Sequence, residues 1–173
     1  RFLVTTLGKG VIRAKDTPNF IANRVGVFSM LATIHHAERL GIGFDTVDAL
    51  TGALIGRPKS ATFRTADVVG LDTFAHVVNT MRDTLPDDPW HAYYVVPAWL
   101  QGLIDQGALG QKTRKGVYQK VGRDIKVLDL KSGEYQVSDG KADESVMAIL
   151  KHRNPAERFA QLHGSSHPQA QFI

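Results

Sequence analysis

The chain has 173 residues, 43% hydrophobic and 22% charged, which is typical of a folded globular protein and argues against wholesale disorder. It contains no cysteine, which excludes disulfide bonds, zinc–thiolate sites and a cysteine nucleophile and fits a reducing compartment, so we expect a cytoplasmic protein. The net charge of +4 comes from scattered Lys and Arg residues without interleaved aromatic residues, so we expect no nucleic acid partner.

The first segment predicts a helix end over residues 1–8, closed by Gly8, and a short strand over residues 10–14. A lone strand at the start of a helical chain needs a sheet to join. Because the chain also begins with Arg rather than Met, we expect a piece of a longer protein. No signal peptide is recognisable, and no apolar run approaches the roughly 18 residues that span a membrane.

Residues 18–40 predict a long helix, with Asp16 or Thr17 as its N-cap and Pro18 in the first helical position. Asn23 is unusual there, since asparagine is a poor residue for a helix interior. A helix that is apolar around much of its girth needs cover on several sides, so we expect the chain to self-associate. The apolar residues recur at helical spacing: Phe20, Ile21, Val25, Val27, Phe28, Leu31, Ala32 and Ile34.

Gly41 and Gly43 end this helix, and four more helices are predicted before residue 107. Asp45 is expected to cap the first of them and Asp72 the third. Asp67 is expected to face solvent. The four predicted ranges are 45–55, 61–69, 73–84 and 97–106.

Alternating apolar residues then predict strands over 116–121, 125–130 and 135–137, with a turn in which Gly133 can adopt a positive φ. Two short helices are predicted over 143–152 and 155–163, and the closing sequence HPQAQFI indicates a cut before another element. The predicted fold class is mainly α: a helical bundle with a short β-hairpin near residues 117–137.

Spacing alone reveals no catalytic or metal-binding motif. The glycine pairs at 8–10 and 41–43 lack the third glycine and the strand–turn–helix context of a dinucleotide site. His35 and His36 point about 100° apart on a helix, so we expect no metal site. Asn23 is the better candidate because its amide both donates and accepts hydrogen bonds. Two interpretations stay open: Asn23 holds a carbonyl oxygen or water, or it only hydrogen-bonds to backbone at a domain junction.

Three stretches together resemble the C-terminal domain of the 3-hydroxyacyl-CoA dehydrogenases in order and spacing. They are KDTPNFIANRVG at 15–26, ADVVGLDT at 66–73 and LGQKTRKGVY at 109–118. The resemblance covers about residues 1–120 and implies that 1–14 are a remnant of an upstream Rossmann domain and 15–120 the helical domain. Residues 121–173 look like a linker toward a further domain, as in multifunctional members of the family. Arg114 departs from the pattern, which commonly has glycine there, and so does the sequence after Pro58.

The resemblance implies an NAD-dependent oxidation of 3-hydroxyacyl-CoA to 3-ketoacyl-CoA in fatty-acid β-oxidation, by a homodimer. In the family the Asn of the Asn-Arg pair helps to position the substrate, and here that residue is Asn23. The family's catalytic His, its partner Glu, an assisting Ser and the NAD-binding glycine loop belong to the Rossmann domain, so we expect the isolated chain to be inactive. The alternative is a non-catalytic helical module that binds acyl-CoA or mediates assembly.

Overall fold

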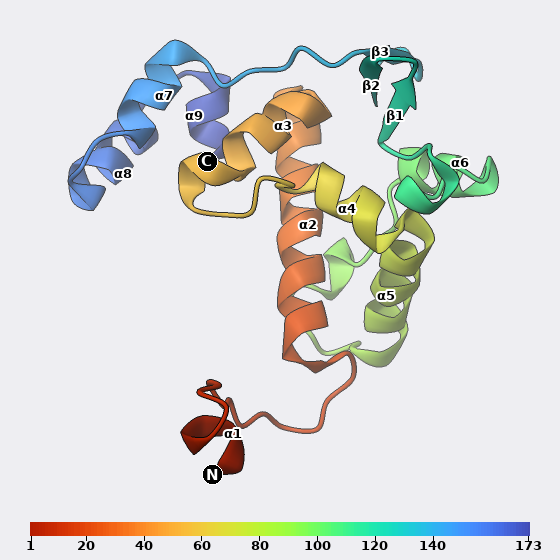
Figure 1. Cartoon of the computed structure of the whole chain (residues 1–173), viewed down its shortest axis with the longest axis vertical. Helices are drawn as coiled ribbons and strands as arrows, with labels where there is room; N and C mark the ends of the chain where they lie inside the picture. Colours follow the sequence, from red (N-terminus) through yellow and green to blue (C-terminus); the bar gives the residue numbers. More distant parts are fainter.

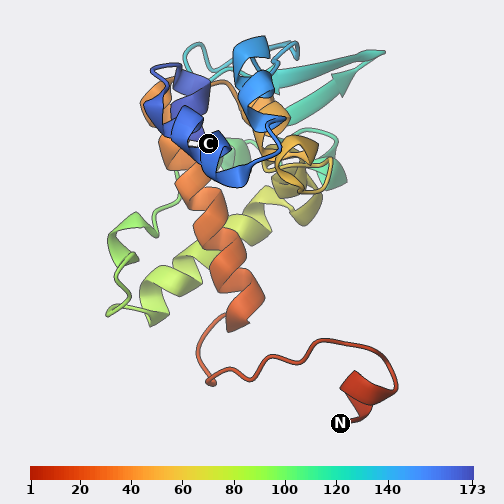
Figure 2. The same ribbon diagram turned by 90° about the vertical axis from the view of Figure 1, so that its left-hand side faces the viewer.

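A computed structural model describes residues 1–173 and shows a bundle of helices with a small sheet at one end (Figure 1). The long helix α2 crosses α5, and shorter helices pack around this pair (Figure 2). None of the helices has both the length and the apolar character that a membrane crossing requires. The helices of the bundle are α2 (Phe20–Leu40), α3 (Phe44–Thr51), α4 (Phe63–Val69), α5 (Leu71–Thr84) and α6 (Ala98–Asp105).

The sheet has three antiparallel strands in the order β1-β2-β3: β2 and β3 form the hairpin whose return strand the sequence predicts, and β1 pairs with the other edge of β2. Tyr118 lies opposite Val127 and Leu128 opposite Tyr135, which sets the register. Gly133 has a φ of 73° in the turn before β3, as its position predicts. The strands are β1 (Tyr118–Val121), β2 (Asp124–Leu128) and β3 (Tyr135–Val137).

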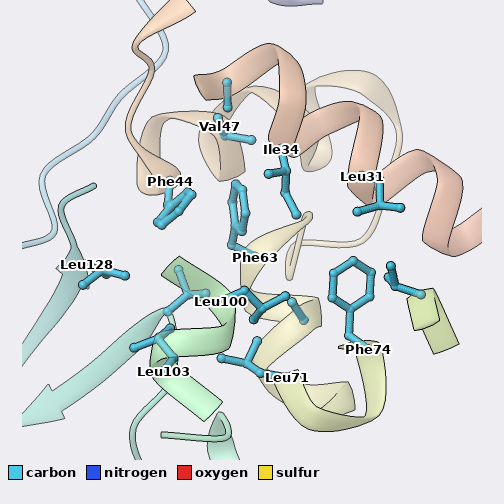
Figure 3. Packing of buried hydrophobic residues seen from close by; sticks show 14 of the residues in the cluster. Leu31, Ile34, Phe44, Val47, Phe63, Leu71, Phe74, Leu100, Leu103 and Leu128 are labelled. Atoms are coloured by element: carbon cyan, nitrogen blue, oxygen red, sulfur yellow. The ribbon is translucent and has the colours of Figure 1, made fainter. Parts of the chain in front are cut away.

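A single cluster of 21 buried residues joins the helices to the sheet. Phe44 of α3 and Phe63 of α4 are both 1% exposed, and their ring centroids lie 4.2 Å apart (Figure 3). Full burial of a side chain of this size contributes roughly 1.5–3 kcal/mol. α2 contributes Leu31 and Ile34 to the same cluster, as its apolar stripe predicts.

Three C-terminal helices form a smaller unit around a second buried cluster that includes Leu50 of α3. Asp143 and Asn154 cap the first two of them by accepting the N–H of Ser145 and Ala156. The third, in the closing HPQAQFI sequence, was not predicted, and it packs against both α2 and α8. These helices are α7 (Glu144–Leu150), α8 (Pro155–Gly164) and α9 (Pro168–Phe172).

The first nineteen residues lie away from the bundle (Figures 1 and 2). They hold one short helix, α1 (Phe2–Thr5), and then irregular backbone in which Val11 and Ile12 are exposed. The predicted strand at 10–14 is therefore wrong for this chain. A strand is stable only when a neighbouring strand accepts and donates its hydrogen bonds, and the sheet at 118–137 has no edge beside this segment.

Three predicted N-caps are also wrong. α2 begins two residues later than expected: Asn19 precedes it with a φ of 66°, so neither Asp16 nor Thr17 caps the helix. Glycines precede α3 and α5 in place of Asp45 and Asp72, which lie in the first turns. Each aspartate has a longer-range partner that its local sequence does not reveal.

The carboxylate of Asp45 accepts the backbone N–H of Gly140 at 2.8 Å and the Ser138 hydroxyl at 3.3 Å. Asp72 forms an ion pair with Lys112 at 2.7 Å. Asp45 thereby holds the segment between β3 and α7 against α3. Asp72 links α5 to the turn that precedes the sheet.

Two buried carboxylates join the helices to β1, and the expectation that Asp67 faces solvent is wrong. Asp67 is 5% exposed and accepts the N–H groups of Val117 and Tyr118, both at 2.8 Å. Burial raises the pKa of Asp67, although these two hydrogen bonds oppose the shift. The close approach also explains two glycines: a Cβ at Gly110 or Gly116 would overlap atoms of Asp67.

Asp48 is the second buried carboxylate that joins the helices to β1. Its carboxylate accepts the backbone N–H of Phe63 at 2.7 Å and those of Thr62 and Arg64 at 3.0 Å, which are the free donors at the start of α4. The hydroxyl of Tyr118 donates to it at 2.8 Å. Burial raises the pKa of both Asp48 and Tyr118. α3, α4 and β1 are thus joined through two side chains.

Gly116→Ala is expected to destabilise the chain by roughly 2–6 kcal/mol. The added methyl displaces the Asp67 carboxylate and leaves two buried N–H groups without an acceptor, each costing roughly 1–3 kcal/mol. Urea unfolding followed by circular dichroism measures the change.

The matched control is Gly102→Ala in α6, where a Cβ meets no atom within 4 Å. Alanine there should leave stability unchanged or raise it by about 0.5–1 kcal/mol, since glycine is unfavourable inside a helix. Equal unfolding midpoints for Gly116→Ala and the unmodified chain would contradict the role given to Asp67.

Candidate functional site

Asn23 lies in the first turn of α2, at the end of the buried stripe of that helix. The stripe continues at helical spacing through Val27, Leu31 and Ile34, all less than 9% exposed, whereas Asn23 is half-buried. The Asn23 side chain makes no hydrogen bond to any residue of the chain. Its amide is therefore available to a group that comes from outside.

The backbone at the start of α2 also has free donors. The N-cap residue, Asn19, makes no side-chain hydrogen bond to the helix, and no acidic residue lies in the first turn. The positive end of a 21-residue helix dipole and its first N–H groups are thus uncompensated beside Asn23. Asn19 has a φ of 66°, which asparagine tolerates better than most residues, and its amide nitrogen is buried without a partner.

An ion pair fixes the loop beside this helix end. Arg24 donates to Asp88 at 2.6 Å, and Asp88 also accepts the backbone N–H of Trp90 at 2.9 Å. Burial alone would raise the pKa of Asp88, but the hydrogen bonds from Trp90, Tyr94 and Arg24 together hold it below its usual value. Burial and the neighbouring Asp88 raise the pKa of Tyr94 to about 12.

A groove of about 530 Å³ lies between α2 and the segment that follows Asp88. Its walls are largely aromatic: the rings of Phe28 and Trp90 are 5.2 Å apart, and those of His35 and Tyr93 are 5.6 Å apart. The Arg24–Asp88 pair lies one helical turn from Phe28 on the same face of α2. The residues that line the groove include Phe28, Leu31, Ala32, His35, Trp90, Tyr93, Tyr94 and Val95.

The two adjacent histidines have different surroundings. His35 is exposed and faces Tyr93, whereas His36 is half-buried, and burial together with the nearby Arg39 lowers its pKa. No three His, Asp or Glu side chains gather closely enough to hold a metal ion. His35 and His36 line the aromatic groove, whereas Asn23 lies outside its lining, at the N-terminal end of the same helix.

Sequence reasoning did not find the Arg24–Asp88 pair. The two residues are 64 positions apart, and no spacing rule connects them. The one available signal is that Arg24 is the only charged residue between Phe20 and Ile34, since a partly buried arginine needs an acceptor.

Comparison with known proteins identifies the domain. The family described as "3-hydroxyacyl-CoA dehydrogenase, C-terminal domain" matches residues 20–120, a range that contains Asn23, the Arg24–Asp88 pair and both buried aspartates. The chain belongs to the 3-hydroxyacyl-CoA dehydrogenase family. Its matched range is the helical bundle with the start of β1, in agreement with the sequence motifs.

Relatives in several organisms carry the same domain. The chain is 49% identical over 123 residues to a probable 3-hydroxyacyl-CoA dehydrogenase of Bacillus subtilis, covering 71% of this chain and 16% of that protein. It is 41% identical over 119 residues to a probable 3-hydroxyacyl-CoA dehydrogenase of Deinococcus radiodurans, covering 69% of this chain and 34% of that protein. The chain thus spans about a third or less of these curated relatives.

A solved structure has the same fold. The crystal structure of FadB2 from M. tuberculosis aligns with a TM-score of 0.58 and 30% sequence identity, covering 69% of this chain and 40% of that one. The mainly helical architecture of this dehydrogenase-family domain is therefore shared with an experimentally determined protein.

Asp88→Asn is expected to lower the melting temperature at pH 7, because it removes the charge of one partner of a partly buried ion pair. The folded pKa of Asp88 lies below its unfolded value, so the contribution is complete above about pH 4 and disappears as the pH falls through the folded pKa. Thermal unfolding of both proteins between pH 7 and pH 2 measures this.

Asp87→Asn provides the comparison, since Asp87 is exposed and has no ion-pair partner. It should unfold like the unmodified chain at every pH. A deficit of Asp88→Asn that stays constant down to pH 2 would show that the carboxylate charge contributes nothing.

Proposed function

We propose that this chain is the substrate-binding and dimerisation domain of an NAD-dependent 3-hydroxyacyl-CoA dehydrogenase that acts in fatty-acid β-oxidation. The observation that carries the proposal is the match over residues 20–120, within which the Asn23 amide has no partner in the chain. A Rickettsia prowazekii relative, 32% identical over 119 residues, is described as a putative fatty acid oxidation complex trifunctional enzyme, which supports the same metabolic role.

The chemistry of the α2 terminus suits an acyl-CoA thioester. Asn23 can donate its amide N–H to a carbonyl oxygen of the substrate, and the free N–H groups and the positive end of the helix dipole favour the partial negative charge on that oxygen. A group held in this way is oriented before reaction, which is how a positioning residue accelerates a reaction. Asn23 makes no hydrogen bond within this chain, so on this proposal its partner is the substrate, whereas the structural alternative needs a backbone partner from the adjoining domain.

We propose that NAD is bound mainly by residues outside this chain. Gly41 has a φ of 65° as the C-cap of α2, and Gly43 directly precedes α3, so this glycine pair forms two helix ends and not a phosphate loop. We infer that an upstream Rossmann domain, of which 1–14 are the last part, binds NAD and supplies the catalytic base. On this proposal 15–120 form the dehydrogenase's helical domain, 121–173 lead toward a further domain, and the isolated cytoplasmic chain forms no NADH.

Asn23→Ala in the full-length enzyme is expected to lower kcat/KM on the order of 10²-fold, the usual cost of removing one positioned donor. The melting temperature should change little, because the amide has no partner within the chain to lose. Steady-state kinetics with 3-hydroxybutyryl-CoA and thermal unfolding on the same preparation measure both quantities.

Ser29→Ala is the matched control: Ser29 is half-buried on the same helix, and its side chain makes no hydrogen bond. It should leave both quantities unchanged. A large fall in the melting temperature of Asn23→Ala, with near-normal kcat/KM per folded molecule, would return Asn23 to a structural role at the domain junction.

The exposed start of α2 supports self-association of the 173-residue chain. Phe20 is 63% exposed and Val25 64%, and Ile21 lies between them. Sedimentation velocity at high micromolar concentration should therefore show a dimer, and Val25→Glu should shift the population to monomer. Phe159→Glu on α8, where Phe159 is equally exposed at 67%, should leave the dimer intact. Monomer alone at every concentration would refute the proposed dimerisation role.

A further inference from the structure

A second hollow, of about 660 Å³, lies between α4, the turn at 110–114 and the first two strands. It shares no lining residue with the aromatic groove, and α4 and β1, which line it, lie away from the N-terminal end of α2 (Figure 1). Three cationic side chains line it, from three different parts of the chain: Arg64 of α4, Arg114 of the turn and Lys120 of β1.

The positive charge of this hollow is not balanced by ion pairs. None of the five ion pairs in the structure involves Arg64, Arg114 or Lys120. The one carboxylate in the lining is Asp67, and each of its oxygens accepts a backbone N–H from β1 or the residue before it. The hollow therefore has three cationic side chains and one carboxylate, that of Asp67, so its lining carries an excess of positive charge.

The guanidinium of Arg64 is held in place before any ligand binds. Its central carbon lies 4.2 Å from the centre of the Tyr118 ring, and the Tyr118 hydroxyl is itself fixed by its bond to Asp48. A guanidinium stacked on a ring keeps its N–H edge free to donate. Gln111 and Gln119 add amide donors to the same lining.

Arg114 has a backbone conformation that an arginine rarely adopts. Its φ is 57°, in the left-handed region where the Cβ of an L-residue is crowded and which glycine adopts without a steric penalty. A residue kept in such a conformation, with its side chain lining a hollow, indicates a function for the side chain.

We propose that this hollow binds a phosphate-bearing ligand, with Arg64 and Arg114 as bidentate donors and Lys120 as a third cation. Guanidinium groups match the geometry of phosphate oxygens, and bonds in which both partners are charged are stronger than neutral ones. The phosphates are either free or carried on a nucleotide. The site is additional to the dehydrogenase function and does not depend on it.

The test uses isothermal titration calorimetry on the 173-residue chain at low salt, with inorganic pyrophosphate and, separately, adenosine 3′,5′-bisphosphate. We expect saturable one-to-one binding that weakens as NaCl is added. Arg114→Gly should weaken binding by about tenfold or more, because it removes a bidentate donor of charged hydrogen bonds. The same variant should melt at a higher temperature, because glycine relieves the backbone strain. A variant that gains stability while losing affinity separates ligand binding from a structural role.

Two further variants complete the test. Lys120→Gln, on an exposed position of β1, should weaken binding several-fold without a change in melting temperature. Arg153→Gln removes the same charge from the exposed turn between α7 and α8 and should leave the affinity unchanged.

Tighter binding of the bisphosphate than of pyrophosphate would identify a nucleotide ligand, and equal binding would identify phosphate alone. No saturable heat up to about 10 mM ligand, or equal affinity in Arg114→Gly and the unmodified chain, would overturn the proposal.

Discussion

The Asp67 carboxylate is the contact on which the junction of helices and sheet depends. Its two oxygens orient the chain where it enters β1, by accepting the N–H groups of Val117 and Tyr118. That orientation directs the Tyr118 hydroxyl to Asp48, which holds the first turn of α4. The Asp67 side chain therefore fixes the position of the sheet, and with it the β1 wall of the hollow that Arg64, Arg114 and Lys120 line.

A buried carboxylate is a costly way to join two elements, because burial disfavours its charge. The six hydrogen bonds that Asp48 and Asp67 accept compensate for this cost. Such a junction tolerates few changes, since removal of any one partner leaves a polar group buried and unpaired. The same junction brings together the sequence motifs at 66–73 and 109–118. Besides the hydrogen bonds of Asp67, the N–H of Leu71 donates to the carbonyl of Leu109 at 3.2 Å, and Asp72 pairs with Lys112.

Local pattern predicted most of the helices and all three strands, because apolar spacing and turn glycines act over a few residues. It failed where a side chain bonds to a distant part of the chain. Local sequence predicts that Asp67 faces solvent and that Asp45 and Asp72 cap helices, because an aspartate near a helix end has the same local sequence whatever its true partner. The Arg24–Asp88 pair was missed for the same reason. Asn23 stands out because it interrupts an apolar stripe, a signal that is itself local, and its role stays a prediction.

The packing of α9 against α2 has a consequence for biosynthesis. α2 ends at Leu40, and Phe172, which contacts both buried clusters, leaves the ribosome more than a hundred residues later. At roughly 5–20 residues per second, the side of the longest helix that α9 covers stays exposed for about 7–26 seconds during translation. Over that interval the nascent chain presents an apolar helix face to whatever lies near the tunnel exit, so this domain is a natural client for a ribosome-associated chaperone.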